Sequence, residues 1–364
     1  MSDLEVGGLQ RHAIDLARRL RARGYFVKLV VARDNVSPRL LEGMQPEDYV
    51  LLNDSRRMLD PRSWPRAWRT VAGFRPDVVV GVGPTPPSIM AFGRLAGRVR
   101  AKLACTFGTT IPKPRDPSTK PLFGWTMART DALAYCSQVQ AAFWKARGVA
   151  SRNDVVIYNG VDTEAYRPPS AAERAAGRAL VGLADGDYVV GHVGAFRVEK
   201  NHVQLVQAVH DLRAEGLPAK GLFVGGGVTR PEIEAKAAAL GVTDHIVLAG
   251  EHSDVRPFIH AMDMGVLCST GVETFSLSAL EMLSSGVPMV HSLLGGAAEM
   301  MRDEVNGYLF PIGDTARLVQ VLTEAAAPSV RARLSAAARA DILARFAIET
   351  MVDQYDVLFR RLAA

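Results

Sequence analysis

The sequence from residue 271 to residue 288 reads GVETFSLSALEMLSSGVP. The pattern predicts a loop that becomes a helix between Thr274 and Ser276 and ends at Gly286, with Pro288 beyond it. Apolar runs typical of strands flank this stretch at residues 264–268 and 287–290. A helix that starts between two parallel strands opens its free amides at the carboxyl edge of the sheet. Open α/β folds bind phosphate-bearing ligands there.

Two acidic residues accompany this predicted anion site. Glu273 lies at its mouth and Glu281 lies two turns further along. A carboxylate beside bound phosphate is reasonable where the same ligand also offers neutral hydroxyl groups, as a sugar nucleotide does. The alternative is that Glu273 is an ordinary loop residue and that Glu281 complements the helix dipole. The stretch alone favours neither interpretation.

Length and composition indicate a soluble protein of two domains. The chain has 364 residues, of which 48% are hydrophobic and 22% charged, and this length exceeds what one core usually supports. No apolar run reaches the length of a membrane span, and the start lacks the shape of a signal peptide. We therefore expect a cytoplasmic protein. Cys105, Cys136 and Cys268 end apolar runs without metal-ligand spacing, which predicts reduced core thiols and no metal site.

Charge is divided unevenly along the chain. Residues 1–165 contain 25 Lys and Arg against 15 Asp and Glu, a net charge of +10, and the remainder contains 18 against 23, a net charge of −5. A basic first half indicates an anionic partner. A lipid surface or a phosphorylated acceptor fits, whereas no nucleic-acid motif accompanies the charge. In the helix predicted at 9–23, five arginines form either a solvated face or a contact with anionic membrane.

Strand-like runs alternate with helical segments through both halves. The first half has such runs at residues 25–32, 49–52, 77–82, 101–106, 132–136 and 154–158. After a hinge region at 152–187, the second half has strands at 188–194, 221–224 and 245–248 and helices at 201–213, 231–240 and 255–261. This alternation predicts two doubly wound parallel sheets, Rossmann-like halves that bind a ligand between them. The predicted domains are residues 1–165 together with a last helix within 347–364, and residues 166–346.

A second group of candidate residues follows the strand at 188–194. Arg197 and Lys200 lie on the loop that leads into a helix, where cations and free amides can converge on a diphosphate. Asn201 and Gln204 predict a variant of the capping box at the start of that helix.

Weaker candidates lie at other loop positions. Gly7 and Gly8 would let the backbone pass close to a phosphate, although most such pairs are simple turns. His252 follows a strand end where a nucleobase edge could meet main-chain groups. His12 could approach the ligand, although a structural role is favoured. The sequence Asp185-Gly186-Asp187 precedes a strand at its amino end, which indicates a turn and not a metal site.

With these residues assembled, the chain resembles family four of the retaining, nucleotide-sugar-dependent glycosyltransferases, which have the GT-B architecture. The resemblance covers nearly the whole length. It is carried mainly by Glu273-x7-Glu281 with the tail Gly286-x-Pro288 and by Arg197-x-x-Lys200-Asn201. Supporting motifs are the glycine pair before the first helix, Asn159-Gly-Val-Asp162, Gly295-Gly-x-x-Glu299 and Asn306-Gly-x-Leu309.

The resemblance implies a role for each matching residue. Arg197 and Lys200 would neutralise the departing diphosphate, and Glu273 would bind hydroxyls of the donor sugar. Glu281 would bind the ribose. The amides of Phe275, Ser276 and Leu277 would help to hold phosphate and sugar, and Gly8 would touch the phosphates from the other domain. The family transfers sugar with retention of configuration and without a metal, from a nucleotide-sugar donor and with no further cofactor.

The implied activity is transfer of a hexose-type sugar from a UDP- or GDP-linked donor to a glycan or lipid-linked acceptor, in bacterial envelope or exopolysaccharide assembly. Two departures from the family pattern keep other readings open. Only six residues precede Gly7, where the family has a strand, so either the true start lies upstream or this edge of the sheet is incomplete. The run from Cys105 to Thr110 lacks the family's histidine, and Gly108 takes its place.

These departures support an alternative, a binding scaffold with a degenerate site. A third reading is a sugar-nucleotide epimerase of the same architecture. Acceptor recognition in this architecture would fall on loops such as residues 112–121.

Overall fold

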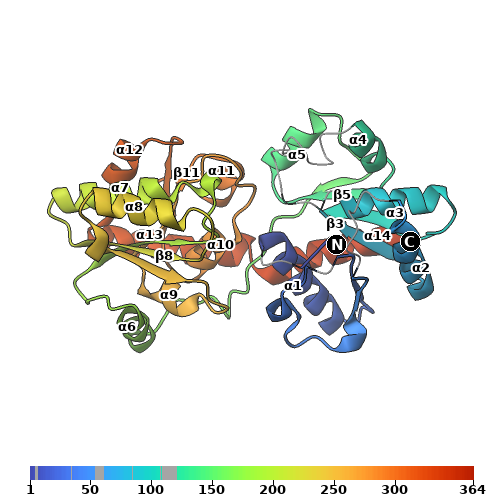
Figure 1. The fold of residues 1–364 in the computed structure, drawn as a ribbon, viewed down its shortest axis with the longest axis horizontal. Coiled ribbons are helices and arrows are strands. Elements are labelled where there is room, and N and C mark those ends of the chain that lie inside the picture. The colour runs from blue at the N-terminus through green and yellow to red at the C-terminus, as the bar shows by residue number, and fades with distance from the viewer. Residues whose placement is uncertain (5–6, 34, 54–60, 84, 107, 109–120) are drawn as a thin grey trace. The chain divides into compact units, whose positions relative to one another are not determined.

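The computed structural model describes residues 1–364 except 5–6, 34, 54–60, 84, 107 and 109–120. The chain divides into two compact units, Met1–Asn159 with Glu349–Ala364, and Gly160–Ile348. The first unit ends at Asn159, a few residues before the predicted boundary at 165, and it also includes the last helix of the chain. Figure 1 shows helices and strands alternating through both units.

The second unit contains one parallel sheet of six strands. The sheet order is β12-β11-β10-β7-β8-β9, so the chain winds outward twice from the neighbouring strands β7 and β10. The point between them is the topological switch point, where ligands of open α/β sheets bind. The strands are β7 (Tyr188–Val193), β8 (Ala219–Val224), β9 (Ile246–Gly250), β10 (Met264–Leu267), β11 (Met289–Ser292) and β12 (Gly307–Phe310).

Helices cover both faces of this sheet. Figure 1 shows α7, α8 and α12 on one side of β8, with α9 and α6 on the other. The helices are α6 (Ala171–Leu180), α7 (His202–Ala214), α8 (Arg230–Ala239), α9 (Arg256–Ala261), α10 (Leu277–Ser284), α11 (Ala297–Met300), α12 (Thr315–Ala325) and α13 (Pro328–Arg345). All six residues of β7 are buried, as expected for a parallel strand covered on both faces.

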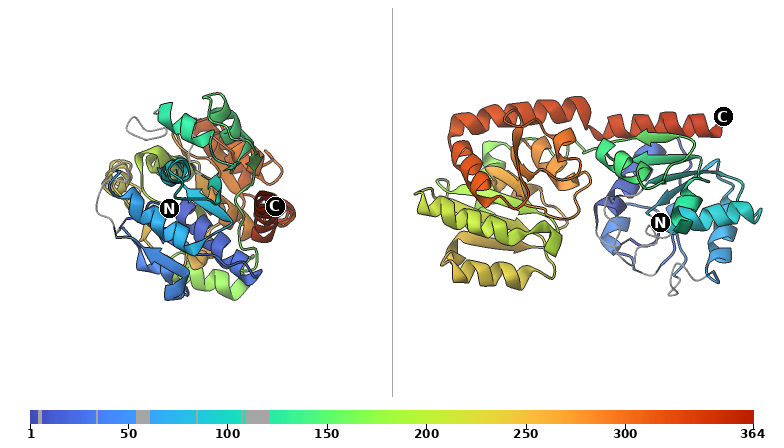
Figure 2. Two further views of the ribbon diagram at one scale, coloured as in Figure 1. Left: turned by 90° about the vertical axis from the view of Figure 1, so that its right-hand side faces the viewer. Right: turned by 90° about the horizontal axis from the view of Figure 1, so that it is seen from above.

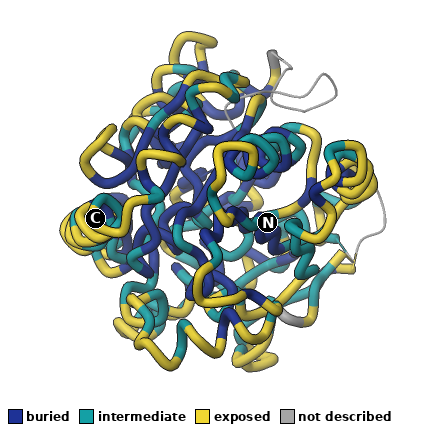
Figure 3. Tube along the Cα trace, turned by 90° about the vertical axis from the view of Figure 1, so that its left-hand side faces the viewer, coloured by how far each residue is buried: buried dark blue, intermediate teal, exposed yellow. Residues whose placement is uncertain are grey.

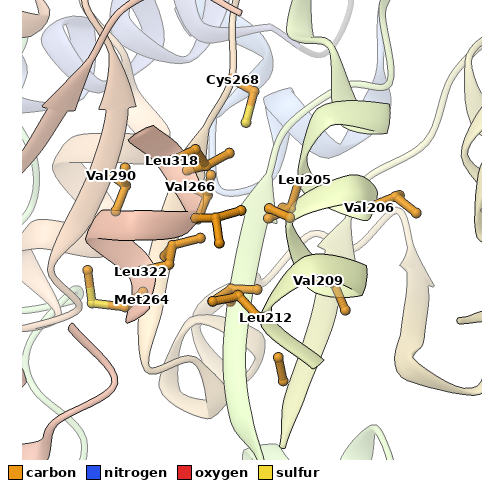
Figure 4. Close-up of a cluster of buried hydrophobic side chains, with 14 of the residues drawn as sticks. Leu205, Val206, Val209, Leu212, Met264, Val266, Cys268, Val290, Leu318 and Leu322 are labelled. Carbon is orange, nitrogen blue, oxygen red and sulfur yellow. The ribbon is translucent and has the colours of Figure 1, made fainter. Parts of the chain in front are cut away.

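The core of the second unit lies between its sheet and the helices α7 and α12. Figure 4 shows leucine and valine side chains of both helices meeting those of β10 and β11, with Cys268 at one end of the cluster. In Figure 3 the buried segments gather in the interior, and the exposed segments are mostly loops and outer helix faces. All three cysteines are free and buried, which confirms the prediction of core thiols, and burial raises the pKa of Cys105 and of Cys268 well above the usual range.

The first unit contains two separate parallel sheets. One has the order β1-β2 and the other the order β3-β4-β5-β6. The strands are β1 (Leu29–Val31), β2 (Tyr49–Leu51), β3 (Val78–Val82), β4 (Lys102–Thr106), β5 (Ala132–Tyr135) and β6 (Asp154–Val156). The helices are α1 (Gly8–Ala22), α2 (Trp64–Phe74), α3 (Thr85–Leu95), α4 (Pro121–Met127), α5 (Gln138–Lys145) and α14 (Ile348–Ala363).

The strand predicted at 25–32 is shorter than expected. Only Leu29–Val31 pairs as a strand, and Phe26, inside the predicted run, is 88% exposed and stacked on Phe74 with 5.1 Å between ring centroids. The apolar pattern misled the prediction because Phe26 makes its contact with a ring on α2 and not with the interior of the sheet.

The last helix, α14, belongs to the first unit and holds α1 by ion pairs. Arg23 pairs with Asp353 and with Glu349, each at 2.6 Å, and Arg19 pairs with Glu349 at 2.7 Å. Figure 2 shows this red helix beside the blue and green elements of the unit. These arginines are therefore engaged within the protein. None of the described helices is both long enough and apolar enough to span a membrane.

His12 of α1 has the structural role that its sequence position favoured. Its side chain is buried, and its Nε2 lies 3.3 Å from the hydroxyl of Tyr355 on α14. Burial lowers the pKa of His12 to about 4, because the charged imidazolium loses its hydration in this environment.

We expect His12 to make the first unit sensitive to mild acid. Between pH 6.5 and about pH 4 the unfolded chain binds a proton at this imidazole and the folded chain does not, so stability falls with pH by up to roughly 3 kcal/mol across the window. His12→Phe should flatten this slope. Urea unfolding of both proteins from pH 4 to pH 8 measures the difference, and parallel profiles would refute it.

Candidate functional site

Two loops meet at the switch point of the second unit. The loop after β7 contains a short 3₁₀ helix, Val198–Lys200, and leads into α7. The loop after β10 leads into α10. A backbone hydrogen bond of 2.9 Å from Thr270 N to Glu199 O ties the two loops together, so the segments that carry Lys200 and Glu273 are fixed against each other.

Lys200 and Glu273 form an ion pair across these loops. The ammonium of Lys200 donates to Glu273 Oε2, which also accepts a hydrogen bond of 2.9 Å from the hydroxyl of Ser269. Glu273 is 8% exposed. Its second oxygen, Oε1, accepts no hydrogen bond from any described residue, so one acceptor of this carboxylate is left for a ligand.

The electrostatic surroundings keep Glu273 charged. Burial by itself raises the pKa of Glu273, but the positive charge of Lys200, the neighbouring His291 and the hydrogen bonds from Lys200 and Ser269 outweigh it, and the pKa lies below its ordinary value. Burial lowers the pKa of His291. The site therefore combines a carboxylate, an ammonium and an imidazole in one buried cluster.

The start of α10 gives this site its amide donors. Ser276 is the N-cap, and its Oγ accepts from Ala279 N at 3.4 Å. The amides of Ser276 and Leu277 donate to no described residue, as expected for the first turn of a helix. Phe275 is buried against Phe346, with 5.4 Å between ring centroids, and so anchors the turn.

Glu281 lies in the middle of α10 and is 4% exposed. The first turn of the helix contains no acidic residue. The interpretation of Glu281 as a simple dipole partner is therefore wrong, because the helix begins at Leu277 and the carboxylate lies beyond its first turn.

Arg197 and Asn201 are the other two residues that the sequence singled out on the loop before α7. Arg197 is exposed and its side chain pairs with no described residue. Asn201 does occupy the N-cap of α7, but in the left-handed conformation with φ 50°, and its side chain caps no amide. Instead its Nδ2 donates to Gln204 Oε1 at 2.9 Å. The predicted capping-box variant is therefore wrong.

The remaining candidates lie outside this cluster. His252 is exposed, packs on Phe258 with 4.2 Å between ring centroids, and its Nε2 lies 2.8 Å from Ala249 O. Gly7 and Gly8 start α1 in the first unit, where Gly7 is extended with φ −165°, a conformation open to any residue. The predicted loop at 112–121 falls almost wholly outside the described residues, as do Phe107, Thr109 and Thr110 of the run that lacks a histidine.

Glycines shape the walls of the site. Gly295 has φ +58°, and a Cβ placed on it would lie 1.5 Å from Glu273 O. Gly225, after β8, has φ +143°, and a Cβ there would lie 2.0 Å from Gly194 O. Only glycine fits such close approaches of one backbone to another. The motif Gly295-Gly296 thus holds the backbone of Glu273 in place, aided by a 2.9 Å hydrogen bond from Gly296 N to Thr274 O.

Sequence reasoning missed Ser269 and His291. Ser269 lies two residues beyond the end of β10, and His291 lies near the carboxyl end of β11, the strand next to β10. Their position at the carboxyl edge was a usable signal, but neither has a motif of its own. Among the described residues, no group of three or more His, Cys, Asp or Glu side chains could hold a metal ion.

We expect Gly295→Ala to disturb the site because the added methyl group must displace the Glu273 carbonyl. Gly186→Ala is the matched control, since a Cβ at Gly186 meets nothing within 4 Å. Gly295→Ala should destabilise the protein by about 1–3 kcal/mol, measured by urea unfolding, and Gly186→Ala should have little effect. Equal stability of the two variants would contradict the tight packing at Gly295.

The lowered pKa of Glu273 also predicts a dependence of stability on pH. The unfolded chain takes up a proton near pH 4.5 whereas the folded chain resists it, so the contribution of Glu273 is full above pH 4.5 and is lost as pH falls through the folded pKa. Glu273→Gln should remove this part of the acid slope. Glu232→Gln, at an exposed position of α8, is the control. The measurement is the free energy of unfolding of each protein from pH 3 to pH 6. If Glu273→Gln leaves the dependence of this free energy on pH unchanged, the lowered pKa of Glu273 is refuted.

Two family models match the chain. The model described as Glycosyltransferase Family 4 matches residues 6–165, and the model described as Glycosyl transferases group 1 matches residues 187–327. The first covers most of the first unit, and the second covers the six-stranded sheet with its switch point.

Several known proteins are similar to the chain in sequence. A putative glycosyltransferase, EpsD of Bacillus subtilis (strain 168), is 28% identical over 199 residues, which are 54% of this chain and 51% of EpsD. The lipopolysaccharide core biosynthesis mannosyltransferase LpsB of Rhizobium meliloti (strain 1021) is 30% identical over 244 residues, 62% of this chain and 65% of LpsB. The chain thus spans about half to two thirds of the length of these relatives.

The fold is similar to that of solved GT-B glycosyltransferases. HepE of Anabaena in complex with UDP superposes with a TM-score of 0.87 at 20% identity, covering 99% of this chain and 98% of HepE. Sucrose-phosphate synthase of Thermosynechococcus elongatus superposes with a TM-score of 0.82 at 19% identity, covering 100% and 95%. At these identities the likeness establishes the fold, two Rossmann-like units of the GT-B type.

Proposed function

Because the chain belongs to the group 1 glycosyltransferases of family 4, we propose that it transfers a hexose from a UDP- or GDP-linked donor to a glycan or lipid-linked acceptor, with retention of configuration and without a metal. The observation that supports this proposal most directly is the pairing of Lys200 with Glu273 at the switch point of the second unit. This position is where α/β sheets bind nucleotides.

Lys200 is suited to stabilise the leaving group. When the bond between sugar and diphosphate breaks, negative charge develops on the diphosphate oxygens. A fixed ammonium and the free amides of Ser276 and Leu277 can offset that charge without reorganising. Arg197 is exposed at the same loop and would add a second cation. Glu273 keeps Lys200 in place through their ion pair. In our proposal, its Oε1 accepts a hydrogen bond from a hydroxyl group of the donor sugar.

The other binding roles rest on the family resemblance. We assign the ribose to Glu281, the nucleobase edge to the main chain near His252, and a phosphate contact to Gly8. HepE was solved with UDP and with UDP-glucose, and LpsB is named a mannosyltransferase. Both a UDP-linked and a GDP-linked hexose are therefore reasonable donors to test.

The names of the relatives favour a role in surface polysaccharide assembly. LpsB is named for lipopolysaccharide core biosynthesis, and we propose a bacterial envelope glycan or lipid-linked intermediate as the acceptor. A peripheral contact with anionic membrane would have to use basic residues other than Arg19 and Arg23, which are paired with α14. The protein would then act at the cytoplasmic face of the membrane.

Substitution of Lys200 tests the proposed catalysis. Lys200→Met should lower the rate of sugar transfer by about 10²–10³, because the leaving group loses its nearest fixed cation. Lys220→Met is the matched control, since Lys220 lies near the amino end of β8 and donates to Asp244 O. The measurement is release of UDP or GDP from a panel of nucleotide sugars, with thermal unfolding confirming that both variants fold.

Binding and turnover together separate enzyme from scaffold. Calorimetry with UDP and GDP identifies the base, and a donor-hydrolysis assay follows with the preferred nucleotide sugar. Tight binding without any turnover would overturn the enzymatic proposal in favour of a scaffold. Interconversion of the donor sugar without acceptor would indicate an epimerase. Full activity of Lys200→Met would exclude the assigned role of this lysine.

A further inference from the structure

Two buried histidines flank the loop at 194–201, which carries Lys200. His192 lies near the carboxyl end of β7 and is 2% exposed, and His202 is the first residue of α7 and is 3% exposed. Their rings are in contact, with 4.4 Å between centroids in a T-shaped arrangement. A Cβ built on Gly194, the first residue of the loop, would lie 3.4 Å from His192 Nε2. The pair is therefore packed against the loop to which we assign the diphosphate, and none of the roles proposed for that site uses it.

Most of the hydrogen-bonding capacity of this pair is unused. His192 Nδ1 lies 3.1 Å from Val266 O, and because a carbonyl oxygen only accepts, Nδ1 carries the proton of the neutral ring. His192 Nε2 is then an acceptor. It has no hydrogen-bond partner among the described residues, and neither has either ring nitrogen of His202. Since buried polar groups are nearly always hydrogen-bonded, three unpaired ring nitrogens in one place call for an explanation.

The groups that face the pair are aromatic rings, a carbonyl and a cation. They are Phe196 and Lys200 on the loop, Phe223 on β8, the Val266 carbonyl on β10 and His291 on β11. Glu273, the carboxylate of the site, is bound to Lys200. Burial and then Lys200 lower the pKa of His202 to about 4, and burial, His202 and Lys200 lower the pKa of His192 well below its ordinary value. Both rings are therefore neutral at neutral pH in the ligand-free protein.

A diphosphate bound at the loop would reverse the sign of the charge beside these rings. The pyrophosphate of a nucleotide sugar carries a negative charge on each phosphate, and the molecule has no group that titrates near neutral pH. A nearby negative charge favours the protonated form of an imidazole, and the interaction is stronger in buried surroundings than in water. His202 has two unpaired nitrogens and can therefore hold an added proton, and the lone pair of His192 Nε2 can accept a hydrogen bond from it.

We propose that His202 takes up one proton when a nucleotide sugar binds at the loop at 194–201, and that His192 Nε2 accepts a hydrogen bond from the imidazolium that forms. The proton comes from the solvent and returns to it when the nucleotide leaves. The added positive charge acts on the diphosphate through the loop, beside that of Lys200, so His202 is a positioning residue and not a catalytic one. This inference rests on the proposed function, because it takes the ligand of the loop to be a diphosphate.

Calorimetry in buffers of different ionisation enthalpy counts this proton. UDP-glucose and GDP-mannose are titrated into the protein at pH 5.5 in cacodylate, MES and bis-Tris, and the slope of the observed enthalpy against the ionisation enthalpy of the buffer gives the number of protons taken up. We expect at least about 0.3 proton per nucleotide sugar bound. Because linkage is reciprocal, the affinity should also rise by about threefold or more between pH 8 and pH 5.5.

Substitution of His202 assigns the proton to its residue. His202→Phe removes both unpaired nitrogens and keeps an aromatic ring against Phe196, so it should abolish the proton uptake and the dependence of affinity on pH. At pH 8, where His202 is neutral, its affinity should stay within about threefold of the unmodified protein. His210→Phe is the matched control on the same helix, because His210 is bonded to Asp211 at 2.8 Å, and it should keep the uptake. Thermal unfolding checks that each variant folds, and His202→Gln, with the same expected results, replaces His202→Phe if that variant does not.

The outcomes separate this inference from the proposed function. If neither nucleotide sugar binds at either pH, the proposed donor is wrong and the inference fails with it. If a nucleotide sugar binds to the unmodified protein without proton uptake, the proposed function stands and the inference alone is wrong. Uptake that persists in the His202 variant, or that is lost in His210→Phe, also overturns the inference, because the proton then belongs to another group.

Discussion

The ion pair between Lys200 and Glu273 is the interaction on which the arrangement of the second unit's ligand edge depends. A buried carboxylate is costly unless a cation and hydrogen bonds compensate it, and Lys200 and Ser269 provide both. The two partners come from loops after β7 and β10, which are neighbours only because the sheet reverses its winding there. The tight contact of Gly295 with the Glu273 carbonyl and the bond from Thr270 to Glu199 then fix both loops.

Much of the fold could be predicted because its signals are local. The apolar runs that became β7 and β10 lie between clear helix signals, and the Ser276 N-cap and Gly286 mark the ends of α10. Prediction failed where a distant contact replaced the local one. Phe26 looked like part of a strand, but it stacks on Phe74. The separation of β1 from β3 is also a property of strand pairing, which the sequence of either strand does not reveal.

The site was predictable at the level of residue type but not of pairing. Loop position and charge indicated Lys200 and Glu273 independently, yet their spacing of more than seventy residues gave no sign that they bond to each other. The capping prediction for Asn201 failed because residue type does not reveal backbone conformation. Asparagine is a common cap residue, but here its backbone is left-handed and its side chain bonds to Gln204. His291 was missed because a histidine within an apolar strand has no motif until β10 and β11 are paired.

The strand that precedes a helix determines how firmly the first turn of that helix is held, and the two units differ in this respect. In the second unit the buried strand β7 delivers the chain to the loop at 194–201, so Lys200 and the beginning of α7 inherit their positions from the centre of the sheet. In the first unit α1 begins at Gly8 after a ladder of only a few bonds from residues 1–4 to β1. Any contact that Gly8 makes with a phosphate therefore depends on how firmly those residues are held.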